Sequence, residues 1–322
     1  MRTQKLFLPG LLAGTLLLSA CGGGGDAFEE ADGGSGAEAT DGGTGGSIVV
    51  GGAQFTEMSV MENMYALLLE EAGYDVDLQT AEQREIYAPA LVSGEIDVVP
   101  EYAATFVQYL NREANGPDAE EITSNDVDET IAAGEPLAEE QGLTFLEPAE
   151  AQDANGFYVT QAFADENGLT TLSDLGELGQ PIQLAAGDEC LDRPFCAPGL
   201  EETYGLDITG VTGDSFASLT GKQKVVDGTA QLGLTGTTDG TLEGLGLVIL
   251  EDDKGLQAAD NLVPVVNEET AGDPAVAEAL NQLAPVLTTE DLTQLNLQVD
   301  EQRLLPEDVA RDYLVEQGLI EG

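Results

Sequence analysis

The stretch REIYAPALVSGEIDVVPEY, residues 84–102, predicts a helix, a turn and a strand in direct succession. Its first nine residues have the apolar spacing of a short helix over 84–92. Residues 94–100 (GEIDVVP) begin with a turn glycine and continue as a short apolar run, which indicates a turn into a strand. A helix that leads directly into an apolar strand is typical of an α/β sheet.

The residues on either side of this stretch repeat the same alternation. Residues 47–51 (SIVVG) and 74–78 (YDVDL) predict strands. Between them Thr56 is a candidate helix cap, and the apolar residues that follow it recur at helical spacing. A further helix is predicted over 103–111. Strand, helix, strand, helix and strand in this order predict a parallel α/β sheet.

Ligands of such sheets bind at the carboxyl ends of the strands, in the loops that lead into helices. Three loops of this kind are predicted at 52–55, 80–84 and 101–105.

The remainder of the chain predicts a second set of strands and helices, including a helix over 215–227. Extended polar segments near 148–155 and 251–262 separate the two sets. We therefore predict one lobe from residues 47–150 and 253–322, with the C-terminal helices completing it, and a second lobe from residues 151–252. A cleft between two lobes is the expected place for a ligand.

The composition is strongly acidic, with 61 Asp and Glu, 10 Lys and Arg, and a formal net charge of −51. This charge argues against nucleic acid or an anionic lipid surface as a partner. It favours adaptation to high salt, where screening relieves the repulsion among like charges. The chain has no histidine, so the commonest general base and metal ligand are missing.

The N-terminus predicts export. Residues 1–20 combine a basic start with an apolar run that is too short to span a membrane comfortably. The ending Leu-Ser-Ala-Cys resembles a bacterial lipobox, which makes Cys21 the lipidated residue. Residues 21–46 are rich in glycine and acidic residues and predict a flexible tether. An ordinary secretory signal is the alternative. We expect the protein at the extracytoplasmic face of the cell membrane, held by a lipid anchor.

The segment GDECLDRPFCAPGL, residues 187–200, holds the other two cysteines. In a reducing compartment Cys190 and Cys196 would indicate a metal site or a reactive thiol, and in an oxidising one a disulfide. The export signal favours a Cys190–Cys196 disulfide. Such a short loop adds little stability, so its expected role is to fix the direction of Arg193.

Six blocks of sequence carry a resemblance to a known family. They are IVVGGAQFTE (48–57), REIYAPALVSGEIDVVPEYAAT (84–105), QDANGFYVT (152–160), DECLDRPFCAPGLEETYG (188–205), GTTDG (236–240) and LVILEDDKG (247–255). In this order they resemble the substrate-binding lipoproteins of quaternary-amine ABC importers, over about residues 47–318. The resemblance implies the two-lobed type II periplasmic-binding-protein fold, whose lobes close by a hinge motion.

The resemblance also implies a function and a site. A glycine betaine, choline or carnitine type of osmolyte would be captured between the lobes and passed to a membrane permease, without any cofactor or metal. A trimethylammonium group is held by aromatic faces, and a ligand carboxylate by arginine or backbone N–H groups. The expected ligand-binding residues are Tyr102, Thr105, Glu189, Arg193, Gln54, Phe55, Asp153, Asn155, Phe157 and Thr237.

The chain departs from the family pattern at several places. Ala53 and Gln54 replace a common lysine and asparagine, and no aromatic residue is present near Gly236. A second aromatic of the family lies near Lys222, and the sequence shows no complete aromatic cage.

Structural roles remain open for the same residues. Tyr102 could pack on the sheet, Arg193 could pair with Asp192 or Glu189, and Arg84 could be a solvated charge at a helix start. Glu101 could balance Arg193 or cap a helix.

Other classes of function are less well supported. A Ser–His–Asp hydrolase is excluded because there is no histidine, and no Gly-x-x-x-x-Gly-Lys-Ser/Thr phosphate loop is present. We therefore expect a binding protein and not an enzyme. A different small zwitterion as ligand, or a sensor built on the same fold, remains an alternative. The expected assembly is a monomer.

Overall fold

The computed structural model describes residues 45–322. These residues belong to one compact unit, Asp41–Gly322. The predicted signal segment 1–20, Cys21 and nearly all of the predicted tether lie outside the described residues. In the described part of the chain, no helix has both the length and the apolar character that crossing a membrane would need.

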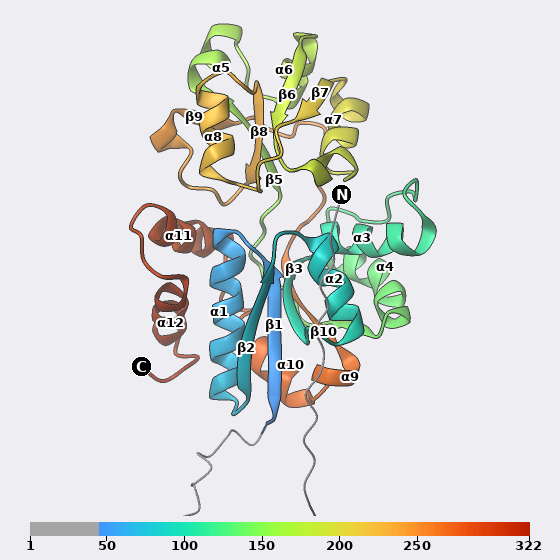
Figure 1. Cartoon of the computed structure of the whole chain (residues 1–322), viewed down its shortest axis with the longest axis vertical. Coiled ribbons are helices and arrows are strands. Elements are labelled where there is room, and N and C mark those ends of the chain that lie inside the picture. Colours follow the sequence, from blue (N-terminus) through green and yellow to red (C-terminus); the bar gives the residue numbers. More distant parts are fainter. Residues whose placement is uncertain (1–44) are drawn as a thin grey trace, which may run out of the picture. The chain divides into compact units, whose positions relative to one another are not determined.

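The first sheet has the strand order β2-β1-β3-β10-β4 (Figure 1). Its strands are β1 (Ser47–Ala53), β2 (Asp75–Ala81), β3 (Val98–Tyr102), β4 (Leu143–Phe145) and β10 (Leu262–Asn267). β1 pairs in parallel with β2 and β3, as predicted. β10 runs antiparallel to both β3 and β4, so the sheet as a whole is mixed. The reason is that β10 enters from the second half of the chain, against the direction of the βαβ units.

Helices cover both faces of this sheet, and together they form what we call lobe I. From the N-terminal half come α1 (Thr56–Glu71), α2 (Arg84–Ser93), α3 (Ala103–Asn115) and α4 (Val127–Glu140). From the C-terminal part come α9 (Glu268–Ala271), α10 (Pro274–Leu280), α11 (Thr289–Asp300) and α12 (Pro306–Gln317). α11 and α12 pack against α1, which buries its apolar residues between them and the sheet.

The second sheet repeats the arrangement of the first, with the order β7-β6-β8-β5-β9. Its strands are β5 (Asn155–Thr160), β6 (Pro181–Ala185), β7 (Asp207–Val211), β8 (Leu232–Gly236) and β9 (Leu247–Ile249). Around it lie α5 (Gln161–Asn167), α6 (Leu172–Glu177), η1 (Asp188–Leu191), α7 (Ala197–Tyr204), α8 (Leu219–Val226) and η2 (Glu243–Leu245). Here β5, which follows the first crossing, is the antiparallel strand beside β8. We call this part lobe II.

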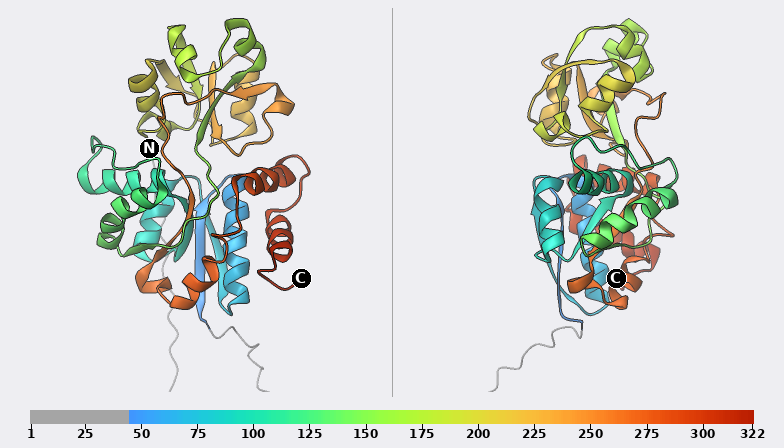
Figure 2. Two further views of the ribbon diagram at one scale, coloured as in Figure 1. Left: turned by 180° about the vertical axis from the view of Figure 1, so that it is seen from behind. Right: turned by 90° about the vertical axis from the view of Figure 1, so that its right-hand side faces the viewer.

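Two segments that run side by side connect the lobes (Figure 2). They pair at an isolated antiparallel bridge between Gln152 and Asn261. The amide of Asp153 donates to the carbonyl of Asp260 at 3.1 Å. Two crossings joined at one point give the lobes a common hinge region, and they bring Asp153 and Asp260 together.

Two local predictions were wrong, and two elements were missed. Thr56 does not cap α1; Phe55 is the N-cap residue, and the Thr56 hydroxyl donates to Asp300 Oδ1 at 2.6 Å. α8 begins at Leu219 and not at 215, because the Ser218 side chain accepts from the Gly221 amide and starts the helix there. β7 and α5 had not been predicted.

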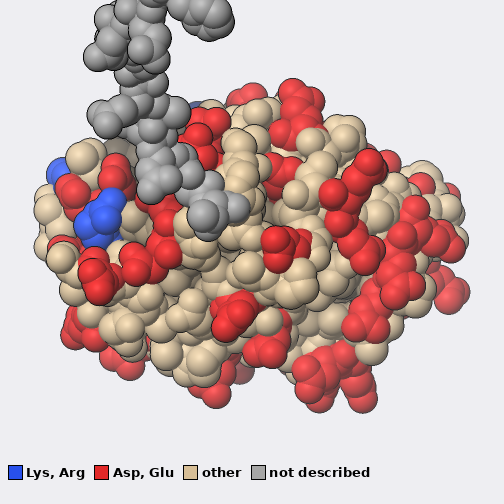
Figure 3. Space-filling model, turned by 90° about the horizontal axis from the view of Figure 1, so that it is seen from below, with Lys and Arg blue, Asp and Glu red and all other residues tan. Residues whose placement is uncertain are grey.

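Acidic side chains dominate the surface. Figure 3 shows one face on which Asp and Glu are spread throughout, while Lys and Arg gather near one side. The acidic composition is therefore a property of the folded surface and not of one segment.

Candidate functional site

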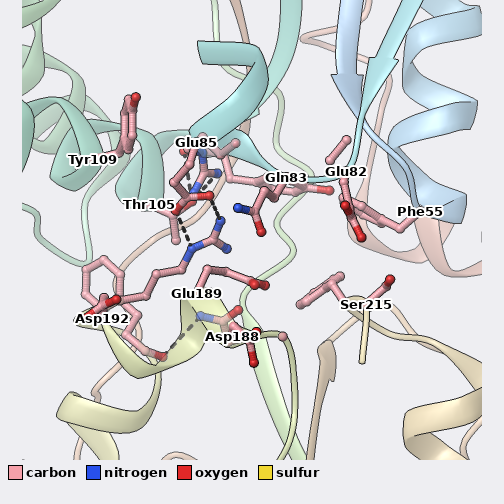
Figure 4. Close-up of a pocket in the computed structure, with 18 of the residues that line it drawn as sticks. Phe55, Glu82, Gln83, Glu85, Thr105, Tyr109, Asp188, Glu189, Asp192 and Ser215 are labelled. Atoms are coloured by element: carbon pink, nitrogen blue, oxygen red, sulfur yellow. Dashed lines mark hydrogen bonds and ion pairs between the residues drawn. The ribbon is translucent and has the colours of Figure 1, made fainter. Parts of the chain in front are cut away.

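A cleft of about 750 Å³ lies between the lobes. All three loops predicted to hold a ligand contribute to its lining, since the parallel strands of lobe I end there. Lobe II contributes the η1 segment and the loop that joins β7 to α8. Figure 4 shows Phe55, Glu85 and Thr105 from lobe I facing Asp188, Glu189 and Ser215 from lobe II.

Aromatic rings from both lobes meet in the cleft. The Phe55 ring stacks against Tyr102 at 6.5 Å and meets Phe216 edge to face at 5.1 Å, measured between ring centroids. Phe55 and Phe216 are half-buried. Phe216 was not among the predicted site residues, because residues 215–227 were predicted to form a helix. It lies in the loop before α8, six positions before Lys222, where the family pattern had called for an aromatic residue.

The hydroxyl of Tyr102 points away from the rings into a buried network. It donates to Glu57 Oε1 at 2.7 Å, and Glu57 Oε2 accepts from Thr238 at 2.6 Å and from Asn296 at 2.7 Å. Burial raises the pKa of Glu57, although these hydrogen bonds oppose the effect. The network joins α1, lobe II and α11, so it fixes the Tyr102 ring at the cleft and links the two lobes.

Arg84 and Glu101 form a buried ion pair behind the cleft. Arg84 Nη2 lies 2.8 Å from Glu101 Oε2, and the Tyr87 hydroxyl also donates to Glu101. Arg84 Nη2 in addition donates to the Thr105 hydroxyl at 2.9 Å. The alternative in which Arg84 is a solvated charge at a helix start was wrong, because the side chain is buried. Glu101 balances Arg84 and not Arg193.

Asp153 and Asp260 line the floor of the cleft and are buried, at 7% and 5% exposure. Asp260 Oδ1 accepts from the Thr105 amide at 3.0 Å, and Asp153 Oδ1 from the Thr238 amide at 3.0 Å. Burial raises the pKa of Asp260 to about 7. Burial and the nearby charge of Glu57 raise the pKa of Asp153 well above its usual value. Among the described residues, neither carboxylate has a cation within salt-bridge distance.

Gly236 explains why one aromatic residue of the family pattern is missing. A Cβ atom at this position would lie 2.2 Å from Asp153 Oδ2. A ring and the buried carboxylate cannot both occupy that space. The chain therefore has a carboxylate against this side of the cleft instead of an aromatic face.

Arg193 belongs to the segment that the Cys190–Cys196 disulfide closes, and the structure contains that disulfide, as predicted. Its guanidinium group reaches across to lobe I. Nε donates to Glu85 Oε1 at 3.1 Å and Nη2 to Glu85 Oε2 at 2.8 Å. The structural alternatives considered for Arg193, Asp192 and Glu189, are not its partners. Nearby, Arg112 donates to the carbonyl oxygen of Asp192.

The remaining predicted residues divide into two groups. Gln54, Asn155 and Glu189 line the cleft. Gln54 donates to Thr80, and Asn155 to the carbonyl of Phe195. Phe157 and Thr237 are not among the lining residues. The Phe157 side chain packs in the core of lobe II, and the Thr237 hydroxyl donates to Asp153 at 3.1 Å, so it holds a lining residue in place.

Two mixed sheets of matching strand order, joined by two crossing segments beside an interlobe cleft, define the class of two-lobed solute-binding proteins. Residues 46–316 match the model of the substrate-binding domain of ABC-type glycine betaine transport systems. The chain belongs to that family. It is an extracytoplasmic substrate-binding protein that takes a small molecule to an ABC permease, and it is not an enzyme.

Individual relatives agree with this family. The chain is 28% identical over 294 residues to a glycine-betaine-binding protein of Pseudomonas aeruginosa, covering 84% of this chain and 88% of that one. It is 29% identical over 285 residues to the glycine betaine-binding protein YehZ of Escherichia coli, covering 84% and 90%. The solved structure of apo YehZ matches with a TM-score of 0.59 at 26% identity, covering 85% of this chain and 99% of that chain.

Proposed function

We propose that the cleft binds the quaternary ammonium group of a small osmolyte, and that the lobes close on it by a hinge motion. The observation that supports this most strongly is the placement of Phe55, Tyr102 and Phe216 around a space whose floor carries Asp153 and Asp260. A quaternary ammonium group has no hydrogen-bond donor, so aromatic faces and nearby negative charge are what hold it. The two relatives described above bear the name of a ligand of this kind, glycine betaine.

Hinge closure would bring the parts of the site together. Phe55 belongs to lobe I and Phe216 to lobe II, so the aromatic pair forms only when the lobes approach each other. In such a design ligand binding and closure are one equilibrium, because the ligand contacts groups that only the closed arrangement brings together. The ligand contacts of Thr105, Gln54, Asn155 and Glu189 remain part of this proposal.

The N-terminal features complete the proposed function. We propose that Cys21 is diacylated and becomes the first residue of the mature chain when residues 1–20 are removed, and that residues 21–46 tether a monomeric binding protein to the outer side of the membrane. Its position would keep the cleft near the permease.

The test is a calorimetric titration of the purified chain with glycine betaine, choline and carnitine. We expect one-to-one binding of at least one of them, weakened at least tenfold in Phe216→Ala, because a desolvated cation–π contact contributes about 2 kcal/mol. Phe163→Ala is the control, since Phe163 packs on the core of lobe II and does not line the cleft. No binding of any of the three ligands would contradict the proposal.

A further inference from the structure

The charged groups that line the cleft are very unequally divided. Nine carboxylates and three guanidinium groups line it. The guanidinium groups belong to Arg84, Arg112 and Arg193. These three are the side chains of the lining that can receive a ligand carboxylate in two parallel hydrogen bonds, because a guanidinium group presents a fork of N–H donors.

Arg84 is poorly placed to exchange its partner. Arg84 is buried, and its carboxylate partner Glu101 is fully buried, so parting them would leave an uncompensated charge in the interior. Arg112 donates to a backbone carbonyl at the edge of the cleft. Arg193 differs, because its carboxylate partner Glu85 is on the opposite lobe and both side chains remain about one-third exposed, at 33% and 38%.

Glu85 occupies the N–H donors of the Arg193 guanidinium group in the way that a ligand carboxylate would. It accepts from both Nε and Nη2, one bond to each of its oxygens. Both residues line the cleft, and Figure 4 shows Glu85 on the side opposite Asp188 and Glu189. Partial burial raises the pKa of Glu85, but the hydrogen bond and the charge of Arg193 outweigh it and lower the pKa overall. Glu85 is therefore a carboxylate at neutral pH.

We propose that Glu85 is a specificity-determining residue, which competes with ligand carboxylates for Arg193 and so favours quaternary amines that lack a carboxylate. The inference rests on the proposed function of the cleft. A carboxylate-free ligand such as choline leaves the Glu85–Arg193 pair intact and adds only its cationic head to an acidic cleft. A betaine whose carboxylate binds Arg193 displaces Glu85, which leaves one more unpaired negative charge beside its own carboxylate.

The experiment compares choline with glycine betaine in titrations of the purified full chain and of Glu85→Gln. We expect the ratio of betaine affinity to choline affinity to rise roughly fivefold in Glu85→Gln, the factor that a partly exposed ion pair supplies. The gain should disappear in the double variant Glu85→Gln/Arg193→Ala, because the guanidinium group that Glu85→Gln makes available is then missing.

Glu82→Gln is the matched control. Glu82 lines the same cleft three positions earlier, and among the described residues it takes part in no ion pair. The substitution Glu82→Gln removes the same charge without changing Arg193, so the ratio of betaine affinity to choline affinity should stay near that of the wild type. An unchanged ratio in Glu85→Gln, an equal change in both variants, or a gain that survives Arg193→Ala would overturn the inference while the proposed function stands. Failure of the wild type to bind either ligand would overturn the inference, and failure to bind carnitine as well would overturn the proposed function.

Discussion

Glu62 is a buried glutamate in α1 that takes part in no ion pair among the described residues. Its exposure is 1%, and among the described residues its Oε1 atom has no hydrogen-bond partner. Burial raises the pKa of Glu62 to about 8. The side chain is in contact with β1, where a Cβ atom on Gly52 would lie 2.5 Å from Glu62 Oε1. Such a group is protonated in the folded protein at neutral pH.

We predict that Glu62→Gln stabilises the protein increasingly as the pH rises. An unfolded glutamate loses its proton near pH 4.3, and the folded one retains it to about pH 8. Between these values the folded state binds more protons, so the free energy of unfolding falls with rising pH. Glutamine removes that dependence. Thermal unfolding should show a gain of the order of 4 kcal/mol above pH 8 and almost none near pH 4. Equal gains at both pH values would contradict this account.

Asp260 gives the cleft a pH dependence of its own. Because burial raises its pKa to about 7, it becomes charged as the pH rises through neutrality. A cationic ligand gains attraction when that charge forms, so choline should bind about fivefold more tightly at pH 8 than at pH 6. Titrations at the two pH values measure this. In Asp260→Asn the ratio of choline affinity at pH 8 to that at pH 6 should change to the value that the remaining titrating groups, chiefly Asp153, produce. A variant that keeps the wild-type ratio would show that Asp260 is not responsible.

Single residues also mark the limit of what the sequence could predict. Tyr102, Thr105 and Phe55 follow predicted strands, and the sheet geometry alone brings them to one edge. Asp153 and Asp260 are 107 positions apart in number and meet only through the pairing of the crossings. Phe216 follows a serine and lies three positions before Leu219, a spacing that is compatible with one continuous helix. Only the cap at Ser218 shows that it lies in a loop.

At the scale of elements, the strands of lobe I and the helices between them followed from their apolar periodicity. The direction of β10 could not be predicted locally, because it depends on which lobe the chain has just left. β7 (DITGV) was missed because a threonine and a glycine interrupt its short apolar pattern. The crossings were recognised as polar and extended, and the structure shows what they do. Glu57 at the start of α1 meets Thr238, which follows β8, and Asn296 of α11 beside these crossings.

We predict that Thr238→Val weakens ligand binding at least tenfold. Thr238 donates to Glu57 across the lobes, and a buried hydrogen bond to a charged group contributes about 1.5–3 kcal/mol. Thr209→Val is the control, because the Thr209 hydroxyl donates to Ile182 within lobe II. Titration with the best ligand measures the effect. If Thr238→Val bound the ligand as tightly as the control, the Glu57 network would have no part in closure.

The acidic surface is a property of the whole molecule. With 61 acidic and 10 basic residues, the folded state carries self-repulsion that isolated ion pairs cannot offset. Salt shortens the range of that repulsion from about 10 Å at 0.1 M to about 3 Å at 1 M.

We therefore predict that the melting temperature rises by several degrees between 0.1 M and 2 M KCl, measured by circular dichroism. A melting temperature that stays constant or falls over this range would contradict adaptation to high salt.

We propose that the cleft recognises the positive charge of a quaternary ammonium group. The most direct measurement titrates the purified chain with choline and with 3,3-dimethyl-1-butanol, which has the same shape but no charge. We predict one-to-one binding of choline and at least tenfold weaker binding of the alcohol, since only the cation gains from the aromatic faces and from Asp153 and Asp260. Equal affinities would show that the cleft selects shape alone and would contradict the account.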